Sequence, residues 1–184
     1  MRKILLTSAG FENRNIEKIF LELVDKEPQD IRALFVPTAA NNIGAIAVLP
    51  KCINDLLGAG IPEDNLAVYD LHEKMDIATL SAYDVIYFSG GVTKHLLSRI
   101  NENGFNKVLE RFLDQGGVYV GVSAGSIVAA ENFADNLGYI NCTIGVHKEN
   151  GSPVGKIDTA NCLHIDLTDS QAILIFGDEC SVID

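Results

Sequence analysis

The sequence predicts an α/β fold: a three-layer sandwich in which helices cover both faces of a mainly parallel central sheet. Apolar runs of strand length alternate with segments of helical period, and such alternation implies right-handed crossovers between parallel strands. The strand runs are almost continuously apolar, which is typical of strands buried on both faces. The 184 residues are 47% hydrophobic and show no repeat, low-complexity tract or linker. We therefore expect a single domain spanning residues 1–184.

The first two thirds of the chain contain five expected strands and five expected helices. The strands are expected at residues 4–7, 32–36, 66–69, 84–88 and 118–120. Helical stripes of apolar residues are expected within residues 16–24, 49–57, 93–100, 105–113 and 124–130. Pro50 either starts or kinks the second of these helices. In a parallel sheet, ligands bind outside the carboxyl ends of the strands, so the loops after Val36, Phe88 and Val120 are the expected functional loops.

The pattern is looser in the last third. Residues 137–146 and 161–167 are predicted as strands. Residues 171–176 and 180–183, joined by Gly177 and Asp178, are predicted as a C-terminal β-hairpin.

The charge and cysteine content exclude several classes of partner. With 14 Lys and Arg against 25 Asp and Glu, the formal charge is -11, so no basic field attracts nucleic acid or an anionic membrane. No apolar run approaches the roughly 18 residues of a membrane span. The apolar stretch near the start of the chain is too short for a signal peptide. Four scattered cysteines form no Cys-x-x-Cys pair. We expect a cytoplasmic protein with free thiols, no metal and no cofactor.

Residues 121–125, Gly-Val-Ser-Ala-Gly, match the Gly-x-Ser-x-Gly pattern between an expected strand and an expected helix. A sharp turn of this kind exposes the serine side chain and points helix amides at an oxyanion, so Ser123 is a candidate nucleophile. The alternatives are a helix cap or a phosphate-binding turn. A dinucleotide site is a weaker interpretation, because the turn lacks Gly-x-Gly-x-x-Gly.

A second glycine turn, Ser89-Gly90-Gly91-Val92-Thr93, ends the preceding strand. In a parallel sheet it can lie beside the serine turn, where the N–H groups of Gly91 and Ala124 converge on one oxygen and form an oxyanion hole. The alternative is an ordinary strand-to-helix turn capped by Thr93. A serine also needs a base. Among four histidines, His147 is favoured because it follows an expected strand and opens a loop, whereas His164 lies inside an apolar run.

The sequence resembles the dipeptidase E (aspartyl dipeptidase) serine peptidases, a family that also includes the cyanophycinases. The resemblance rests on Phe35-Val36-Pro37-Thr38-Ala39, residues 87–93, the turn at residues 121–126, the run from Leu137 to His147, and residues 167–173. It implies a class I glutamine amidotransferase-like fold with flavodoxin-like topology. It also implies Ser123 as nucleophile, His147 as general base, and an oxyanion hole at Gly91 and Ala124. Gly90, Val92 and Thr93 would contact substrate, with Val92 in place of the family's Asn.

Two features depart from that family. Only 24 positions separate Ser123 from His147, and the following helix is cut back. By chain order, Asp135 is the expected acid of the triad, with Glu131 and Asp158 as further candidates. No Arg follows Arg111, and only Lys148 and Lys156 lie near the expected site, so Asp-X specificity is not expected.

The sequence thus predicts a serine hydrolase of the dipeptidase E type that cleaves a small peptide or amide substrate through an acyl-enzyme. The alternative is a degenerate, non-catalytic member of the family that binds a small molecule or a protein partner. That alternative predicts His147 Nε2 far from Ser123 Oγ. A glutamine amidotransferase-like amidase ranks last, because those enzymes carry Cys at the turn. The shortened loops leave either an open site or a site completed by a second subunit in a homodimer.

Overall fold

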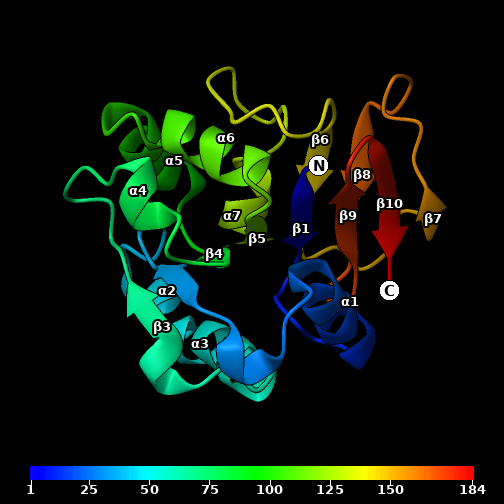
Figure 1. Ribbon diagram of the computed structural model, residues 1–184. Helices are drawn as coiled ribbons and strands as arrows, with labels where there is room; N and C mark the ends of the chain where they lie inside the picture. Colours follow the sequence, from blue (N-terminus) through cyan, green and yellow to red (C-terminus); the bar gives the residue numbers. More distant parts are fainter.

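An eight-stranded sheet forms the centre of the computed structural model, which describes residues 1–184 (Figure 1). The strand order is β3-β2-β4-β5-β1-β9-β10-β7. The bounds are β1 (Lys3–Thr7), β2 (Ala33–Val36), β3 (Leu66–Val68), β4 (Val85–Phe88), β5 (Val118–Val122), β7 (Gly155–Lys156), β9 (Ala172–Phe176) and β10 (Glu179–Ile183). The strands β3, β2, β4, β5 and β1 run parallel, whereas β9, β10 and β7 pair antiparallel. The predicted α/β class and the C-terminal hairpin are confirmed.

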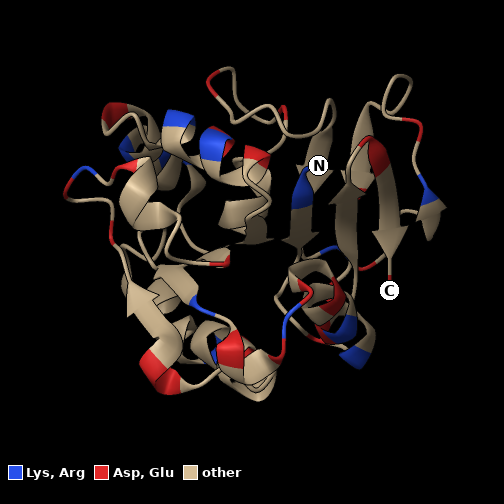
Figure 2. Ribbon diagram, viewed as in Figure 1, with Lys and Arg blue, Asp and Glu red and all other residues tan.

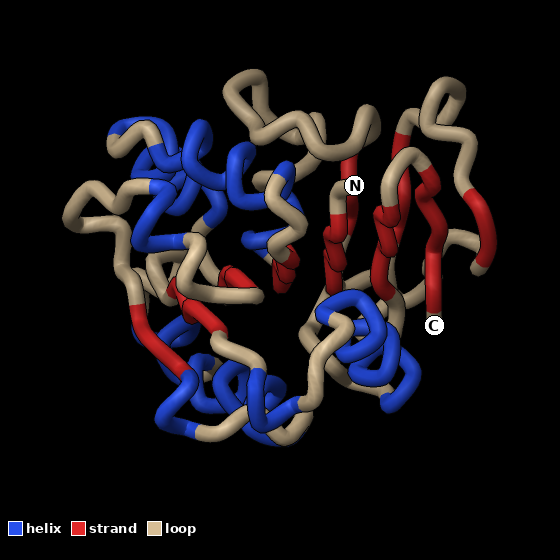
Figure 3. The backbone as a smooth tube through the Cα atoms, in the orientation of Figure 1, coloured by secondary structure: helices blue, strands red, loops and turns tan.

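Helices cover both faces of the sheet, as predicted (Figures 1 and 3). One face carries α4 (Ile77–Leu80), α5 (Thr93–Glu102), α6 (Phe105–Asp114) and α7 (Ala124–Ile127), and the other carries α1 (Arg14–Val24), α2 (Ile43–Ala47) and α3 (Leu49–Gly58). Short 3₁₀ turns occupy Pro28–Asp30 and Glu63–Asn65. A two-stranded parallel sheet, β6 (Thr143–Gly145) with β8 (His164–Asp166), adds buried side chains to the core on the α5 and α6 side.

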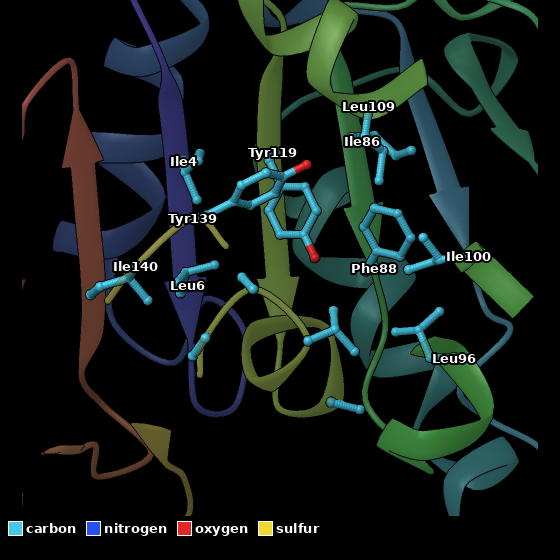
Figure 4. Packing of buried hydrophobic residues seen from close by; sticks show 14 of the residues in the cluster. Ile4, Leu6, Ile86, Phe88, Leu96, Ile100, Leu109, Tyr119, Tyr139 and Ile140 are labelled. Carbon is cyan, nitrogen blue, oxygen red and sulfur yellow. The ribbon is translucent and has the colours of Figure 1, made fainter. Parts of the chain in front are cut away.

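The two cores follow from the alternation of side chains along each strand. In β4, Ile86 and Phe88 point into the core under α5 and α6, whereas Val85 and Tyr87 point into the core under α1 and α3. Figure 4 shows the first of these cores, with Phe88 and Tyr119 stacked and Leu96, Ile100 and Leu109 packed nearby. Burial on both faces is the reason why the strand segments of the sequence are continuously apolar.

Several segments differ from the prediction. The short helices α2 and α4 were not predicted, since neither has an apolar stripe of helical length. The expected helix over residues 124–130 ends at Ile127, and the expected strand over residues 137–146 shrinks to β6. In between, the chain turns back on itself: Leu137 N donates to Val128 O, and Ala130 bridges Ile140. These bonds between the two ends of the loop replace the expected helix and strand.

The strand directions gather five loops at one edge of the sheet. Thr7 pairs with Val122, Gly121 with Phe88, and Phe88 with Val36, so the carboxyl ends of β1, β5, β4 and β2 lie side by side. The antiparallel strand β9 begins at the same edge, because Ala172 pairs with Thr7. None of the helices is long and apolar enough to cross a membrane.

Candidate active site

Ser123 occupies a strained turn between β5 and α7. Its backbone has φ 49° and ψ -102°, a conformation that residues other than glycine rarely adopt. Strain of this kind persists only where the surrounding structure enforces it. Here Ser123 N donates to Thr7 O at 3.0 Å, and Ser126 Oγ donates to Thr7 O at 2.7 Å. The turn therefore projects the Ser123 side chain beyond the edge of the sheet, as in a nucleophile elbow.

Glycines on both sides of Ser123 allow the backbone to approach this closely. A Cβ at Gly121 would lie 2.4 Å from Gly125 O, and a Cβ at Gly125 would lie 2.6 Å from Phe88 O. No other residue type fits these two positions without movement of the backbone. Tyr119 donates its hydroxyl proton to Gly125 O at 2.6 Å, which holds the start of α7 against the sheet. The Gly-x-Ser-x-Gly pattern thus marks a geometric requirement.

His147 faces Ser123, with 3.1 Å between His147 Nε2 and Ser123 Oγ. The histidine follows β6 and lies in the left-handed region at φ 56°. Its backbone N–H donates to the hydroxyl of Ser8 at 2.8 Å. The distance to Ser123 is within hydrogen-bond range, whereas the alternative of a non-catalytic binding protein predicted a wide separation.

The carboxylate partner of His147 is Asp169, which the sequence analysis did not assign. Asp169 Oδ1 lies 2.6 Å from His147 Nδ1 and 3.3 Å from Ser8 Oγ. It precedes β9, and because that strand runs antiparallel to β1, Asp169 lies at the edge of the sheet that carries Ser123. The signal that could have identified it is an acid in the short loop that leads into the first strand of the terminal hairpin. His147 and Asp169 are 51% and 61% exposed, so this contact orients the imidazole more than it stabilises the fold.

Asp135 is not the partner of His147, and the prediction of that residue as the acid is corrected. Its carboxylate and carbonyl oxygens accept from Asn101 Nδ2, at 3.4 and 3.0 Å. Neither of the two further candidates contacts His147. The Glu131 carboxylate makes no hydrogen bond to the imidazole, and Asp158 accepts from Ala160 N and Asn161 Nδ2 in its own loop. Chain order misled the prediction because the acid follows the histidine in the sequence.

The glycine turn after β4 lies directly against Ser123. A Cβ at Gly90 would lie 3.3 Å from Ser123 Cβ. Gly91 has φ 144°, and a Cβ there would lie 2.1 Å from Ala39 O, so glycine is required. The Gly91 N–H has no acceptor in the protein, and Ala124 is the first residue of α7, whose N–H has none within the helix. Both groups are available to an oxyanion.

A small cavity of about 190 Å³ opens beside Ser123 and His147. Gly90, Gly91 and Ser8 line the side next to the serine turn. Ala9, Val48, Lys51, Cys52 and Val122 line the rest. Val92 and Thr93 do not reach this cavity, since they begin α5 instead, so the structure brings only Gly90 of the three expected substrate contacts to it.

The wall formed by α3 carries no free charge. Lys51 pairs with Glu12 and donates to Ala9 O at 3.2 Å. Burial and the neighbouring Asp55 raise the pKa of the Cys52 thiol, which keeps the thiol protonated and neutral. Asp55 lies behind this wall, where it accepts from Tyr87 Oη at 2.5 Å and Phe11 N at 3.1 Å.

A second hydroxyl–imidazole–carboxylate arrangement occurs on the small sheet but lacks the rest of a site. Thr143 Oγ1 lies 2.6 Å from His164 Nδ1, and His164 Nε2 lies 2.9 Å from Asp166 Oδ1. Thr143 is in a regular strand, with no strained turn or free helix amides beside it. His164 is therefore a surface strand histidine with satisfied nitrogens, as its apolar sequence context predicted.

Comparison with solved structures agrees with the fold. A protein from Listeria monocytogenes EGD-e that is provisionally described as a peptidase E matches with a TM-score of 0.74 and 22% identity, covering 100% of this chain and 98% of that one. A peptidase from an acI-B1 Actinobacterium matches with a TM-score of 0.69 and 18% identity, covering 100% and 87%. These neighbours define the class: a mixed α/β protein with the flavodoxin-like fold of peptidase E.

The family follows from the sequence comparison. Residues 4–140 match the model of peptidase family S51, and the chain belongs to that family. It is 29% identical over 134 residues to the uncharacterized peptidase PM1590 of Pasteurella multocida (strain Pm70), covering 72% of this chain and 62% of that protein. It is 28% identical over 136 residues to the uncharacterized peptidase Lin0382 of Listeria innocua serovar 6a (strain ATCC BAA-680 / CLIP 11262), covering 73% and 62%.

The matched region has a boundary that matters for the site. The chain spans about six tenths of the length of these curated relatives, 62% in each case. The family match ends at residue 140 and includes Ser123 with both glycine turns. His147 and Asp169 lie beyond it, so their assignment depends on the geometry described above.

Proposed function

We propose that this protein is a serine peptidase or amidase that cleaves a small peptide or amide through an acyl-enzyme on Ser123. The observation that carries the proposal is the continuous chain from Ser123 Oγ to His147 Nε2 at 3.1 Å, and from His147 Nδ1 to Asp169 Oδ1 at 2.6 Å. It connects a strained serine turn to a base and an orienting acid, the arrangement that nucleophilic acyl transfer requires.

In the proposed mechanism, Ser123 Oγ attacks the substrate carbonyl carbon while His147 Nε2 accepts the hydroxyl proton. The carbonyl oxygen becomes an oxyanion and accepts hydrogen bonds from Gly91 N and Ala124 N. When the tetrahedral intermediate collapses, the C–N bond breaks and His147 returns the proton to the leaving amine. A water molecule then attacks the carbonyl carbon of the ester while His147 Nε2 accepts one of its protons. When this second intermediate collapses, the bond to Ser123 Oγ breaks, the acid product leaves, and His147 returns the proton to Ser123 Oγ. Asp169 holds the imidazole in the tautomer that presents Nε2 as an acceptor.

A fluorophosphonate probe followed by peptide mass spectrometry tests this proposal. We expect the probe to modify Ser123 in the wild-type protein and to leave the Ser123→Ala variant unmodified. Ser98→Ala is the matched control, because Ser98 is exposed on α5 and its hydroxyl donates to Glu102 Oε1, away from the serine turn. That control should retain labelling at Ser123. A folded wild-type protein that the probe does not modify, combined with any peptidase activity that survives in Ser123→Ala, would contradict the proposal.

A further inference from the structure

The cavity next to Ser123 has a size and a chemical character that restrict what it can hold. Its volume of about 190 Å³ is below the roughly 300 Å³ of the smallest pockets for drug-sized ligands. An apolar cavity of about 150 Å³ holds a benzene molecule. Here, part of the space must also hold the carbonyl group that Ser123 attacks. The remainder accommodates a short side chain and not a large aromatic one.

Much of the cavity lining is apolar. Ala9, Val48 and Val122 contribute alkyl groups, and Cys52 contributes a buried neutral thiol. The ammonium group of Lys51 is engaged by Glu12 and by Ala9 O, so it does not present a free cation to a carboxylate. No carboxylate lines the cavity that could pair with a cationic side chain. A charged side chain would lose its hydration there without gaining a partner, which is costly.

From this geometry we infer that the cavity selects substrates whose acyl residue, the one that supplies the scissile carbonyl, has a short and uncharged aliphatic side chain such as that of Ala or Val. This inference rests on the proposed acyl transfer at Ser123. It places the acyl side chain against Val48 and Cys52 of the α3 wall. It also agrees with the absence of any arginine after Arg111, which leaves no guanidinium there for an aspartyl side chain.

A series of fluorogenic amides that differ only in the acyl residue tests the inference. Ala, Val, Leu, Phe, Asp and Lys amides of one coumarin leaving group are compared, each with a free and with an acetylated amino group. We expect kcat/KM for the better of Ala and Val to exceed that for Phe, Asp and Lys by about tenfold or more, the scale of discrimination in a small apolar pocket. A preference for Asp, Lys or Phe would overturn the inference.

Val48 offers a matched pair of variants, because its side chain is 45% exposed and tolerates exchange without loss of the core. We expect Val48→Phe to lower kcat/KM for the Val substrate more than for the Ala substrate. Val48→Ala should raise kcat/KM for Leu and Phe relative to Ala. If the ratios of kcat/KM among these substrates are the same in both variants and in the wild type, the acyl side chain does not occupy this cavity.

Fluorophosphonate labelling separates failure of this inference from failure of the proposed function. A protein that is labelled at Ser123 but prefers Asp amides is a serine hydrolase with another specificity. That result contradicts the inferred preference and leaves the proposed function intact. If such a preference disappears in Lys51→Met, the ammonium of Lys51 is the recognition group. A folded protein that is neither labelled nor active on any substrate contradicts both.

Discussion

Ser8 connects His147, which faces Ser123, to its carboxylate partner Asp169. Its hydroxyl accepts the backbone N–H of His147 at 2.8 Å and lies 3.3 Å from Asp169 Oδ1. Its own N–H donates to Gln171 O at 3.3 Å, and the residue is fully buried. The backbone of His147 is in the left-handed region at φ 56°. The hydrogen bond from His147 N to Ser8 Oγ holds the backbone in this conformation and thereby fixes the position from which the imidazole extends. In the proposed reaction, Ser8 would therefore act as a positioning residue that does not touch the reacting atoms.

We expect Ser8→Ala to lower kcat by about ten- to a hundredfold with little change in KM, because a small displacement of a catalytic group is costly to the rate. The rate of fluorophosphonate labelling should fall in parallel. Melting temperature and KM distinguish positioning from a general structural defect. A variant whose activity falls only because the folded fraction falls would contradict this role.

Asp169 and Asp135 make a matched pair for testing the acid. We expect Asp169→Asn to lower kcat/KM by about 10² to 10⁴, since an amide supports the wrong imidazole tautomer. Asp135→Asn should leave kcat/KM within about twofold, because Asp135 bonds to Asn101 instead of His147. Steady-state kinetics on one amide substrate measure both. Equal losses in the two variants would argue against Asp169 as the orienting acid.

At the scale of elements, helix α3 carries a half-buried acid behind the cavity. Asp55 Oδ2 accepts both from Tyr87 Oη and from the Phe11 N–H, and so joins α3 to β4 and to the loop after β1. Burial raises the pKa of Asp55 above its ordinary value, although both hydrogen bonds act in the opposite direction. The folded protein therefore binds this proton more tightly than the unfolded chain does. The associated stability is present at low pH and is lost as pH rises from the ordinary Asp pKa through the raised one.

Asp55→Asn should remove this loss while retaining an oxygen acceptor for both donors. The melting temperature of the variant relative to wild type should therefore increase as pH rises from about 4 to about 8. For a chain of this length, about 1 kcal/mol corresponds to roughly 2–4 °C. Thermal unfolding at several pH values measures the difference. A difference in melting temperature between variant and wild type that stays constant or shrinks as pH rises would contradict a raised pKa of Asp55.

Over the whole molecule, the charge of -11 is spread across helices and loops on several sides (Figure 2). Such a field disfavours the approach of an anionic substrate, and salt screens it, with a Debye length of about 10 Å at 0.1 M. We expect kcat/KM for the acetylated Asp amide, which is an anion, to rise several-fold between about 10 mM and 200 mM salt. The value for the acetylated Ala amide, which is neutral, should change by less than twofold. Parallel changes for the two substrates would argue against long-range repulsion.

The pattern of the sequence was sufficient wherever one local rule decided the structure. Continuous apolar runs predicted β1, β2, β4 and β5, and a 3.6-residue stripe predicted α1 and α6. The strand–turn–helix context around Ser123 predicted a tight elbow, because Gly121 and Gly125 permit a backbone approach that a Cβ would prevent. Local rules failed over residues 128–142, where backbone hydrogen bonds between residues 128–131 and residues 137–142 outweigh helical and strand propensity.

By itself, the sequence determined the α/β class, the terminal hairpin and the position of Ser123 at a turn, since each depends on the periodicity or the steric demands of neighbouring residues. Only the tertiary structure decided which acid faces His147. Asp169 reaches the imidazole because β9 runs antiparallel to β1 and starts where the parallel strands end. Contact between residues brought together by sheet topology depends on strand order and direction, which no short stretch of sequence encodes.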